Sequence, residues 1–240
     1  MHKSEYKNIF QLEESHFYYL ATHELIIGLV QKYCSIAVKV LDAGCGTGGL
    51  MTKLISSGRD VVGVDKSDEA IRYCLKRRLS VKAASVDKLP FKNGAFDLVV
   101  SVDVLYHLWV KQVNMTIQEF SRVLRPKGWL VVKVPAHNWI RTDHDKLVMT
   151  GRRFSISEVR QMMLEGGFEV SFLSYAHLPL LLISVLKTWL DKGEEKSGVM
   201  PINPVINRLL LGYLKLENWW LLKGWSIPWG NCIVVVARKG

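Results

Sequence analysis

The chain has 240 residues, of which 49% are hydrophobic and 22% charged, and its formal net charge is +10. This composition excludes a disordered or low-complexity chain, and the length predicts either one full domain with an elaboration or two small domains. The excess of basic residues favours an anionic partner such as a phosphorylated substrate, a lipid surface or a nucleic acid. The alternative is that the positive charge only keeps the protein soluble and binds no particular partner.

Cysteine usage and the N-terminal sequence indicate the compartment. Cys34, Cys45, Cys74 and Cys232 stand far apart, so they form neither a zinc framework nor a disulfide scaffold, and a reducing compartment fits best. The N-terminus lacks the apolar core of a secretory signal, and no stretch reaches 18 uninterrupted apolar residues. We therefore expect a cytoplasmic protein.

Short apolar runs alternate with helical segments along most of the chain. The predicted strands are residues 38–42, 60–65, 81–84, 96–102, 129–134, 168–175 and 231–238, and the predicted helices between them are 49–57, 67–78, 113–124 and 155–165. This order predicts an α/β fold with a mostly parallel sheet and helices on both faces. A further helix is expected within the sequence EESHFYYLATHELIIGLV, close to the N-terminus.

The predicted organisation has four parts: residues 1–36 as an N-terminal helical lid region, 37–175 as the core, 176–229 as an insertion, and 230–240 as the last strand of the core. The insertion should contain two helices joined by a polar loop. Within the core, the sequence RPKG at 125–128 predicts a helix stop and a turn, with Gly128 allowing a positive φ. Ser155 or Ser157 should cap the helix that follows.

A glycine-rich loop follows the first predicted strand and opens a helix. The glycines Gly44, Gly46 and Gly49 match GxGxxG, which alone is also compatible with a dinucleotide. Asp42 lies just before them and would repel a pyrophosphate, but it suits a ligand that carries an ammonium or sulfonium charge. Asp65 ends the second strand, where an acid can accept hydrogen bonds from both ribose hydroxyls. S-adenosylmethionine carries both an ammonium and a sulfonium charge and has no phosphate. The alternative is that Asp42 caps a helix and Asp65 begins a turn.

Several motifs in this order resemble one known family. VLDAGCGTGG, VVGVDKS, LPFKNGAFDLVVSVDVLYHL and FSRVLRPKGWLVVKVP, between residues 37 and 136, are similar to the class I S-adenosylmethionine-dependent methyltransferases of the small-molecule "type 11" subgroup. The resemblance implies a Rossmann-like sheet of seven strands, mostly parallel with the last strand antiparallel, and a helical insertion before that strand. It also implies methyl transfer, with S-adenosyl-L-methionine as the cofactor.

The resemblance assigns cofactor-binding residues by position. Those expected to face the methionine part, the ribose and the adenine are Asp42, Gly44, Cys45, Gly46, Gly48, Asp65, Lys66 (through its backbone), Ser85, Val86, Val102 and Asp103. Ser85 stands where the subgroup often has an aspartate that reaches the adenine amino group. Asp87, two residues on, would lie on the same side if the strand continues, and is the expected substitute.

Four residues are candidates for proton chemistry. His107 follows the fourth strand, and the ordinary pKa of histidine suits a base; the alternative is that it packs against the cofactor and only shapes the pocket. Tyr19 and His23 lie in the N-terminal helix, which resembles a lid in this subgroup, although an aromatic face packed on the sheet is the alternative. His144 becomes a candidate because Thr150 stands where relatives have a histidine.

Residues 137–145 contain two histidines and two aspartates, but their spacing matches no zinc pattern, so we predict no metal. Arg152 and Arg153 could bind an anionic acceptor or form a solvated turn. The basic residues are dispersed and form no recognition module, which argues against nucleic acid as a partner.

The acceptor is expected to be a small or lipid-like molecule methylated on oxygen or carbon. Residues 178–186 are apolar, and residues 205–229 are apolar and tryptophan-rich, with Leu209, Leu216 and Trp220 on one predicted helical face. This insertion could cap an apolar acceptor, contact a membrane peripherally or form a homodimer interface. Two other functions stay open: a non-catalytic membrane-peripheral protein that keeps the cofactor fold, and a nucleotide-dependent oxidoreductase.

Overall fold

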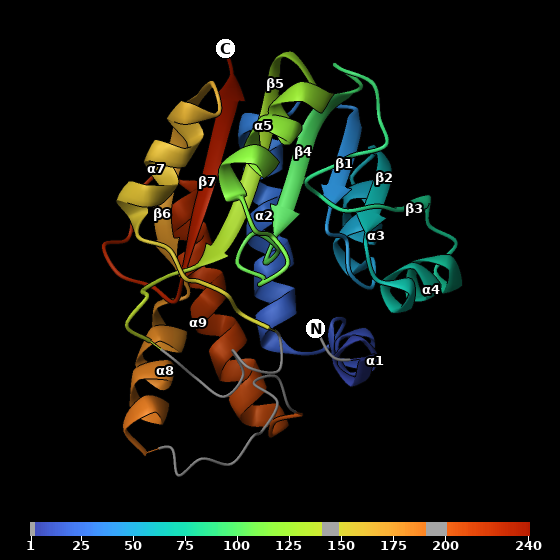
Figure 1. The fold of residues 1–240 in the computed structure, drawn as a ribbon. Coiled ribbons are helices and arrows are strands. Elements are labelled where there is room, and N and C mark those ends of the chain that lie inside the picture. The colour runs from blue at the N-terminus through green and yellow to red at the C-terminus, as the bar shows by residue number, and fades with distance from the viewer. Residues whose placement is uncertain (1–2, 141–148, 191–200) are drawn as a thin grey trace.

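The computed structural model describes residues 3–140, 149–190 and 201–240. A seven-stranded sheet forms its centre, in the order β3-β2-β1-β4-β5-β7-β6. The strands are β1 (Lys39–Ala43), β2 (Asp60–Asp65), β3 (Val81–Ala83), β4 (Phe96–Val102), β5 (Leu124–Pro135), β6 (Phe168–Ala176) and β7 (Cys232–Lys239). β7 runs antiparallel to both of its neighbours, and the other pairs are parallel (Figure 1). The predicted fold class is confirmed.

Helices cover both faces of the sheet. They are α1 (Lys3–Leu12), α2 (Phe17–Tyr33), α3 (Gly49–Ser56), α4 (Asp68–Lys76), α5 (Val113–Val123), α7 (Ile156–Glu165), α8 (Leu178–Leu190) and α9 (Pro204–Leu222). Alternate residues of β4 enter different cores: Leu98 packs with α2 and α3, whereas Val99 packs with α5 and α7. Because both faces are buried, the strand is apolar throughout. A short, continuous apolar run of this kind allows the strand to be predicted from the sequence.

One local prediction is incomplete and another is wrong. The expected N-terminal helix is α2, but a second helix, α1, precedes it, because the chain breaks between Leu12 and Phe17 and the His16 side chain accepts a hydrogen bond from the Tyr18 N–H as the N-cap of α2. Residues 125–128 belong to β5, which follows α5 directly and bulges there against β4. The positive φ of this bulge is at Lys127 (61°) and not at Gly128.

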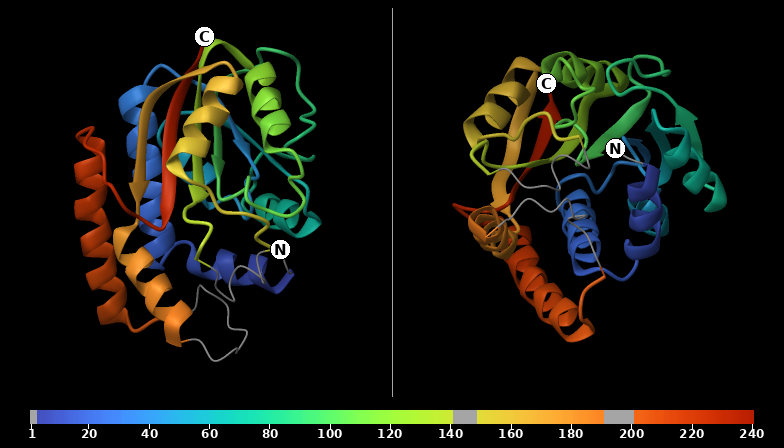
Figure 2. Two further views of the ribbon diagram at one scale, coloured as in Figure 1. Left: turned by 60° about the vertical axis from the view of Figure 1, so that its left-hand side comes forward. Right: turned by 60° about the horizontal axis from the view of Figure 1, so that its bottom comes forward.

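The two helices of the insertion, α8 and α9, extend beyond the carboxyl edge of the sheet, beside α2 (Figure 2). The Glu217 carboxylate of α9 accepts hydrogen bonds from the N–H groups of His177 and Leu178 at the start of α8. α9 is attached to α2 by the hydrogen bond from Asn218 Nδ2 to the Ala21 carbonyl (2.9 Å) and by packing of Leu214. None of the helices, within the described residues, combines the length and apolarity needed to cross a membrane.

Candidate functional site

The loop after β1 has a backbone that only glycine adopts easily. Gly44, Gly46 and Gly48 have φ values of 85°, 53° and 84°, and a Cβ on Gly44 would collide with Val104. By contrast, a Cβ on Gly46 would meet only open space. The loop therefore turns sharply at the carboxyl end of β1, and it leaves room beside Gly46 at the start of α3.

Two carboxylates lie beneath this loop. Asp65 accepts hydrogen bonds from the N–H of Gly46 (3.0 Å) and of Ser67 (2.9 Å), so it links the loop to the end of β2. Asp42 is only 2% exposed, and its Oδ2 accepts no hydrogen bond from the residues that the structure describes. Burial, and then the negative charge of Asp65, raises the pKa of Asp42 to about 7. Asp42 is thus a buried acceptor suited to a cationic ligand.

A second polar cluster lies where β4 and β5 end. Lys133 Nζ is 2.7 Å from Asp103 Oδ2, and the Tyr18 hydroxyl donates a hydrogen bond to the same oxygen (2.8 Å). Burial opposes ionisation of Asp103, but the charge and hydrogen bond of Lys133 outweigh it and lower the pKa of Asp103. Burial likewise opposes the charge of Lys133, and Asp103 raises its pKa well above the usual value. The pair is therefore ionised.

Three more polar side chains surround this pair. Burial raises the pKa of Tyr19 and Tyr106 well above the usual value, and the charge of Asp103 adds to the shift in both. His177 contacts the Tyr18 ring edge-on at 5.7 Å between centroids. Burial, and then the charge of Lys133, lowers the pKa of His177 to about 3. At neutral pH the cluster thus consists of one ion pair, neutral tyrosines and a neutral histidine.

α1 and the turn before α2 cover the glycine loop. The Glu13 carboxylate accepts a hydrogen bond from the Thr47 hydroxyl (2.8 Å) and pairs with Arg77 of α4 (2.6 Å). Tyr6 packs with α4, and burial, followed by the charge of Asp65, raises the pKa of Tyr6 to about 12. Since Asp65 acts on the Tyr6 hydroxyl, α1 lies over the end of β2.

Comparison with known proteins identifies the domain. The family described as "Methyltransferase domain" matches residues 41–132, which include the glycine loop, Asp65 and Asp103. A Mycobacterium tuberculosis protein named as a probable S-adenosylmethionine-dependent methyltransferase is 28% identical over 169 residues, which are 68% of this chain and 61% of that protein. Residues 41–132 therefore form a methyltransferase domain of the type 11 kind, similar to that of S-adenosylmethionine-dependent methyltransferases.

Other similar proteins agree on the fold. The malonyl-[acyl-carrier protein] O-methyltransferase of Legionella pneumophila is 26% identical over 202 residues, covering 75% of this chain and 67% of that enzyme. A solved S-adenosylmethionine-dependent methyltransferase of Archaeoglobus fulgidus superposes with a TM-score of 0.58 at 15% identity, covering 90% of this chain and 94% of that one. The chain spans about three fifths of the length of the mycobacterial relative.

The residues of this domain fit S-adenosylmethionine, the cofactor named for the mycobacterial relative. Asp42 offers a buried carboxylate oxygen with no described partner to an ammonium or sulfonium charge, and Gly46 leaves open space beside it. Asp65 keeps a lone pair for a ribose hydroxyl, because its two oxygens offer about four acceptor positions and the N–H groups of Gly46, Ser67 and Lys66 occupy three of them. Gly44 and Gly48 shape the loop. Cys45 is buried with its sulfur 3.8 Å from that of Cys74, so it packs beneath the loop.

The adenine region differs from the expectation. β3 ends at Ala83, and the chain then turns, with the Lys88 N–H donating to the Ser85 carbonyl (3.2 Å). Asp87 is exposed in this turn, so it does not lie on the same side of a continuing strand as Ser85, and that prediction is wrong. Ser85 is half-buried and Val86 buried. Lys66 places its ammonium over the Trp109 ring, 4.5 Å from the centroid, beside the same region.

The candidates for proton chemistry lie in different places. Tyr19 joins the Asp103 cluster, whereas the His107 ring stacks on Trp109, 5.5 Å between centroids, and packs on Tyr106. Burial lowers the pKa of His23 to about 4, which makes it a weak base. His144 lies outside the described residues. Val102 is the last residue of β4, in register with Lys133.

The paired arginines are engaged within the protein. Arg152 pairs with Glu158 (3.0 Å), and Arg153, which is 5% exposed, donates a hydrogen bond to the Ala136 carbonyl (3.2 Å). Across the described parts of the chain, no three histidine, cysteine or acidic side chains lie together as a metal site would require.

Sequence reasoning missed Lys133, Tyr18 as a hydrogen-bond donor, His177, Glu13 and Tyr6. Lys133 was detectable, because a lysine in the otherwise apolar strand sequence WLVVKVP needs a buried anion. α1 also carried a signal, since Tyr6, Ile9 and Phe10 have helical spacing. The pairing of Tyr18 with Asp103 joins residues 85 positions apart and has no local signal.

Proposed function

We propose that this methyltransferase transfers the methyl group of S-adenosylmethionine to an oxygen atom of a small lipid-like acceptor, and that this oxygen is already anionic or strongly acidic, as in a carboxylate. The cofactor supplies the electrophilic methyl group. The protein must then bind the acceptor in line with that group and exclude water.

The observation that carries the proposal is the protonation state of the second polar cluster. The low pKa values of Asp103 and His177 make both of them weak bases at neutral pH, and the raised pKa values of Tyr19 and Tyr106 keep their hydroxyls neutral. The neutral tyrosine hydroxyls can donate hydrogen bonds, and none of these groups readily removes a proton from an alcohol. An acceptor that needs no deprotonation suits them best.

Hydrogen-bond donors are available to orient such an oxygen. Tyr19 and Tyr106 are half-buried and neutral, whereas the Tyr18 hydroxyl already donates its hydrogen to Asp103. Lys133 adds a positive charge that is held in place by Asp103. One relative, the Legionella enzyme, is named as an O-methyltransferase. An anionic oxygen close to Lys133 would be stabilised by the same donors.

The lipid-like character is supported by apolar side chains at the same edge of the sheet. Trp139 and Trp229 are 62% and 57% exposed, and the Trp229 ring stacks on His137 at 5.8 Å. Leu108, directly after His107, is 64% exposed. Exposed apolar groups beside a site favour an acceptor with a hydrocarbon chain.

The test is a matched panel of acceptors that share one alkyl chain and end in a carboxylate, a phenol, a primary alcohol or an amine. Each is incubated with the cofactor, and products are identified by mass spectrometry. We expect the methyl ester of the carboxylate, no ether of the primary alcohol, and no product with Asp65→Ala, which cannot hold the ribose. Methylation of the alcohol would contradict an acceptor that needs no deprotonation. Methylation of the amine alone would contradict transfer to oxygen, while absence of cofactor binding by the wild type would contradict the cofactor site itself.

A further inference from the structure

One side of α9 packs on the protein and the other side is apolar yet uncovered. Leu214 and Leu221 are fully buried on the inner side. The exposed apolar residues on and just after α9, here termed the α9 face, are Val205, Ile206, Leu209, Tyr213, Leu216, Trp219, Trp220 and Trp225. Leu209 and Leu216 are 69% and 64% exposed. α9 is the outermost element in both views of Figure 2.

The tryptophans of the α9 face form one cluster. The Trp225 ring lies 4.2 Å from that of Trp220 and 6.2 Å from that of Trp219, measured between centroids. The Lys223 ammonium lies 5.7 Å over the Trp219 ring. An exposed apolar surface with clustered aromatic rings is a binding surface more often than an accident of packing.

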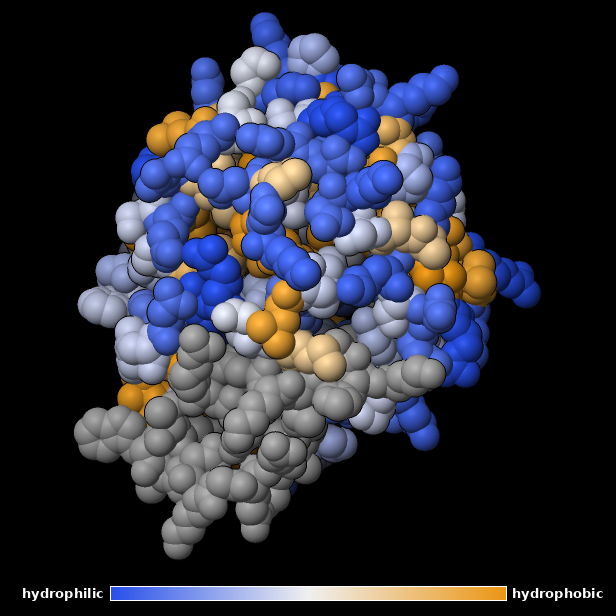
Figure 3. Space-filling model, in the orientation of Figure 1, coloured by the Kyte–Doolittle hydropathy of each residue, from blue (hydrophilic) through white to orange (hydrophobic). Residues whose placement is uncertain are grey.

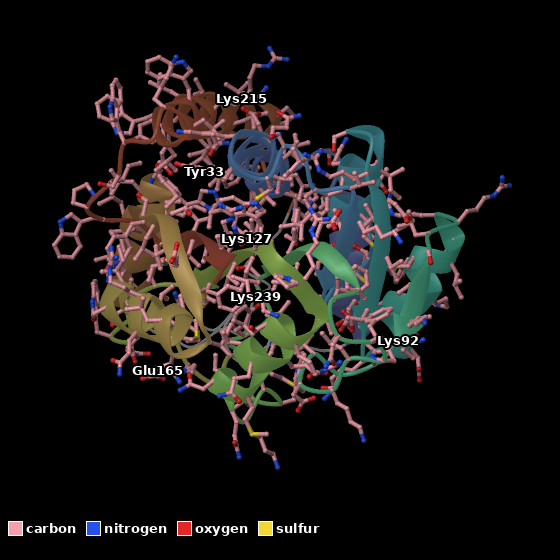
Figure 4. The ribbon with its side chains drawn as sticks, turned by 90° about the horizontal axis from the view of Figure 1, so that it is seen from above. Tyr33, Lys92, Lys127, Glu165, Lys215 and Lys239 are labelled. Atoms are coloured by element: carbon pink, nitrogen blue, oxygen red, sulfur yellow. The ribbon has the colours of Figure 1, made fainter. Side chains whose placement is uncertain are left out.

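The exposed charged residues of α9 and the turn after it are all basic. Between residues 204 and 231 the charged residues are Arg208, Lys215, Glu217 and Lys223, and Glu217 is buried against the start of α8. Figure 4 shows Lys215 beside α9, far from Glu165 and Lys92 on the other side of the molecule. Lys215 lies 3.7 Å from the Glu24 carboxylate of α2, a long contact between two exposed side chains. The face seen in Figure 3, over α4, α5 and α7, is instead predominantly hydrophilic with scattered apolar residues.

We propose that the α9 face docks on the surface of a bilayer that contains anionic lipids, with α9 lying in the plane of the membrane interface. Leu209, Leu216 and the tryptophan cluster would enter the boundary between headgroups and acyl chains. Arg208 and Lys223 would contact anionic headgroups. Tryptophan and basic residues beside a continuous apolar helix face are the features that favour this location.

Charge distinguishes a bilayer from a second copy of this chain. A twofold interface through the α9 face would bring Arg208, Lys215 and Lys223 of one copy near the same residues of the other. The basic residues of the two copies would then repel each other. The acidic residue within 204–231, Glu217, is buried and cannot compensate their charge. An anionic membrane provides the complementary charge instead.

The docking surface is connected to the site by direct contacts, and this part of the inference rests on the proposed lipid-like acceptor. The Asn207 side chain of α9 accepts a hydrogen bond from the Phe17 N–H (2.8 Å), and Leu214 packs with Phe17. Phe17 precedes Tyr18, which hydrogen-bonds Asp103. A membrane-bound α9 would thus hold the acceptor end of the site close to the bilayer that contains the acceptor.

Vesicle flotation with the full chain tests docking without using activity. The vesicles are phosphatidylcholine alone and phosphatidylcholine mixed with phosphatidylglycerol. We expect binding to the mixed vesicles at low salt and weaker binding as salt is added. The variant Leu209→Ser/Leu216→Ser/Trp220→Ser should bind about tenfold or more weakly, since apolar burial drives insertion. Arg208→Glu/Lys223→Glu should lose the preference for the anionic vesicles.

The matched control is Ile36→Ser/Leu75→Ser/Leu164→Ser, which removes three apolar side chains of similar exposure elsewhere (73%, 60% and 59%). It should bind vesicles as the wild type does. Calorimetric titration with S-adenosylhomocysteine checks that each variant is folded, and it separates loss of docking from failure of the cofactor site. Docking is overturned if the wild type stays free of mixed vesicles at low salt, or if the α9 variant binds like the control. A wild-type dimer that the α9 variant converts to a monomer would also overturn it, in favour of a second copy.

Discussion

Lys133 Nζ lies within hydrogen-bonding distance of both carboxylate oxygens of Asp103, 2.9 Å from Oδ1 and 2.7 Å from Oδ2. The two partners differ in their environment, because the Lys133 side chain is 1% exposed and that of Asp103 is 26% exposed. Asp103 also has a φ of 57°, so the chain turns immediately after β4 and directs this carboxylate toward β5. The ion pair therefore joins the ends of the two strands that border the proposed acceptor position.

Breaking this ion pair should have unequal effects on stability. Asp103→Asn leaves the buried Lys133 ammonium without an anion and should lower the free energy of unfolding by about 3–5 kcal/mol. Lys133→Met should cost less, because Asp103 is partly exposed and keeps the Tyr18 hydrogen bond. Urea unfolding measures both. Glu69→Gln, which breaks an exposed ion pair with Arg72, is the control and should change stability by less than about 1 kcal/mol. A larger loss for Lys133→Met than for Asp103→Asn would contradict this account.

Cofactor affinity should depend on pH through Asp42. The pKa of Asp42 is raised to about 7 in the folded protein, so the protonated form stabilises the unliganded fold and this contribution is lost as pH rises through 7. A cationic ligand requires the ionised form, so its binding has the opposite dependence. The Kd for S-adenosylhomocysteine should fall about tenfold between about pH 6 and about pH 8. Calorimetry measures it.

The reference for this titration is Asp42→Asn, which keeps the shape of the side chain and also retains any titration of the ligand itself. It should bind more weakly and without the pH dependence assigned to Asp42. Equal pH dependence in the two proteins would exclude Asp42 as the titrating group.

Ser155, and not Ser157, should contribute the cap of α7. Ser155 Oγ accepts a hydrogen bond from the Glu158 N–H (3.2 Å), and the Glu158 carboxylate accepts one from the Ser155 N–H (2.6 Å). Ser155→Ala removes the first of these and should lower the free energy of unfolding by about 1 kcal/mol. Ser157→Ala is the matched control, expected to stay within about 0.5 kcal/mol of the wild type. Urea unfolding at one pH compares the two, and equal losses would contradict the assignment.

β1, β2 and β4 were predictable because they are largely buried apolar runs that end at a glycine or a carboxylate. β2 and β4 have the predicted bounds, and β1 is shifted by one residue. The start of β5 was not predictable from this pattern, because α5 continues into the strand at Leu124 without a polar loop. Proline and glycine at 126 and 128 suggested a turn, whereas the chain accommodates them in a bulge beside β4.

Half of the site was predictable for a similar reason. The glycine loop and Asp65 are consecutive features of one strand–loop–helix–strand unit, so local spacing brings them together. The second cluster joins α2 with the carboxyl ends of β4 and β5, and the hydrogen bond from Lys133 to Tyr18 spans 115 positions. Only the fold makes such residues neighbours. A buried lysine indicates that an anion is needed, but it does not indicate which one.

Glu13 should control cofactor affinity from outside the core. Its carboxylate joins three elements, because it accepts a hydrogen bond from Thr47 in the glycine loop, pairs with Arg77 of α4 and lies beside Gly49 at the start of α3. Glu13→Ala removes these contacts and should weaken S-adenosylhomocysteine binding about fivefold or more, since losing about 1 kcal/mol of loop stabilisation has that effect. Glu14→Ala is the matched control, because Glu14 pairs with the same Arg77 but is 66% exposed and does not contact the loop. Its Kd should stay within about twofold of the wild type. If calorimetry gave both variants the same Kd, the contact with Arg77 alone would explain the effect, and Glu13 would have no separate role in holding the loop.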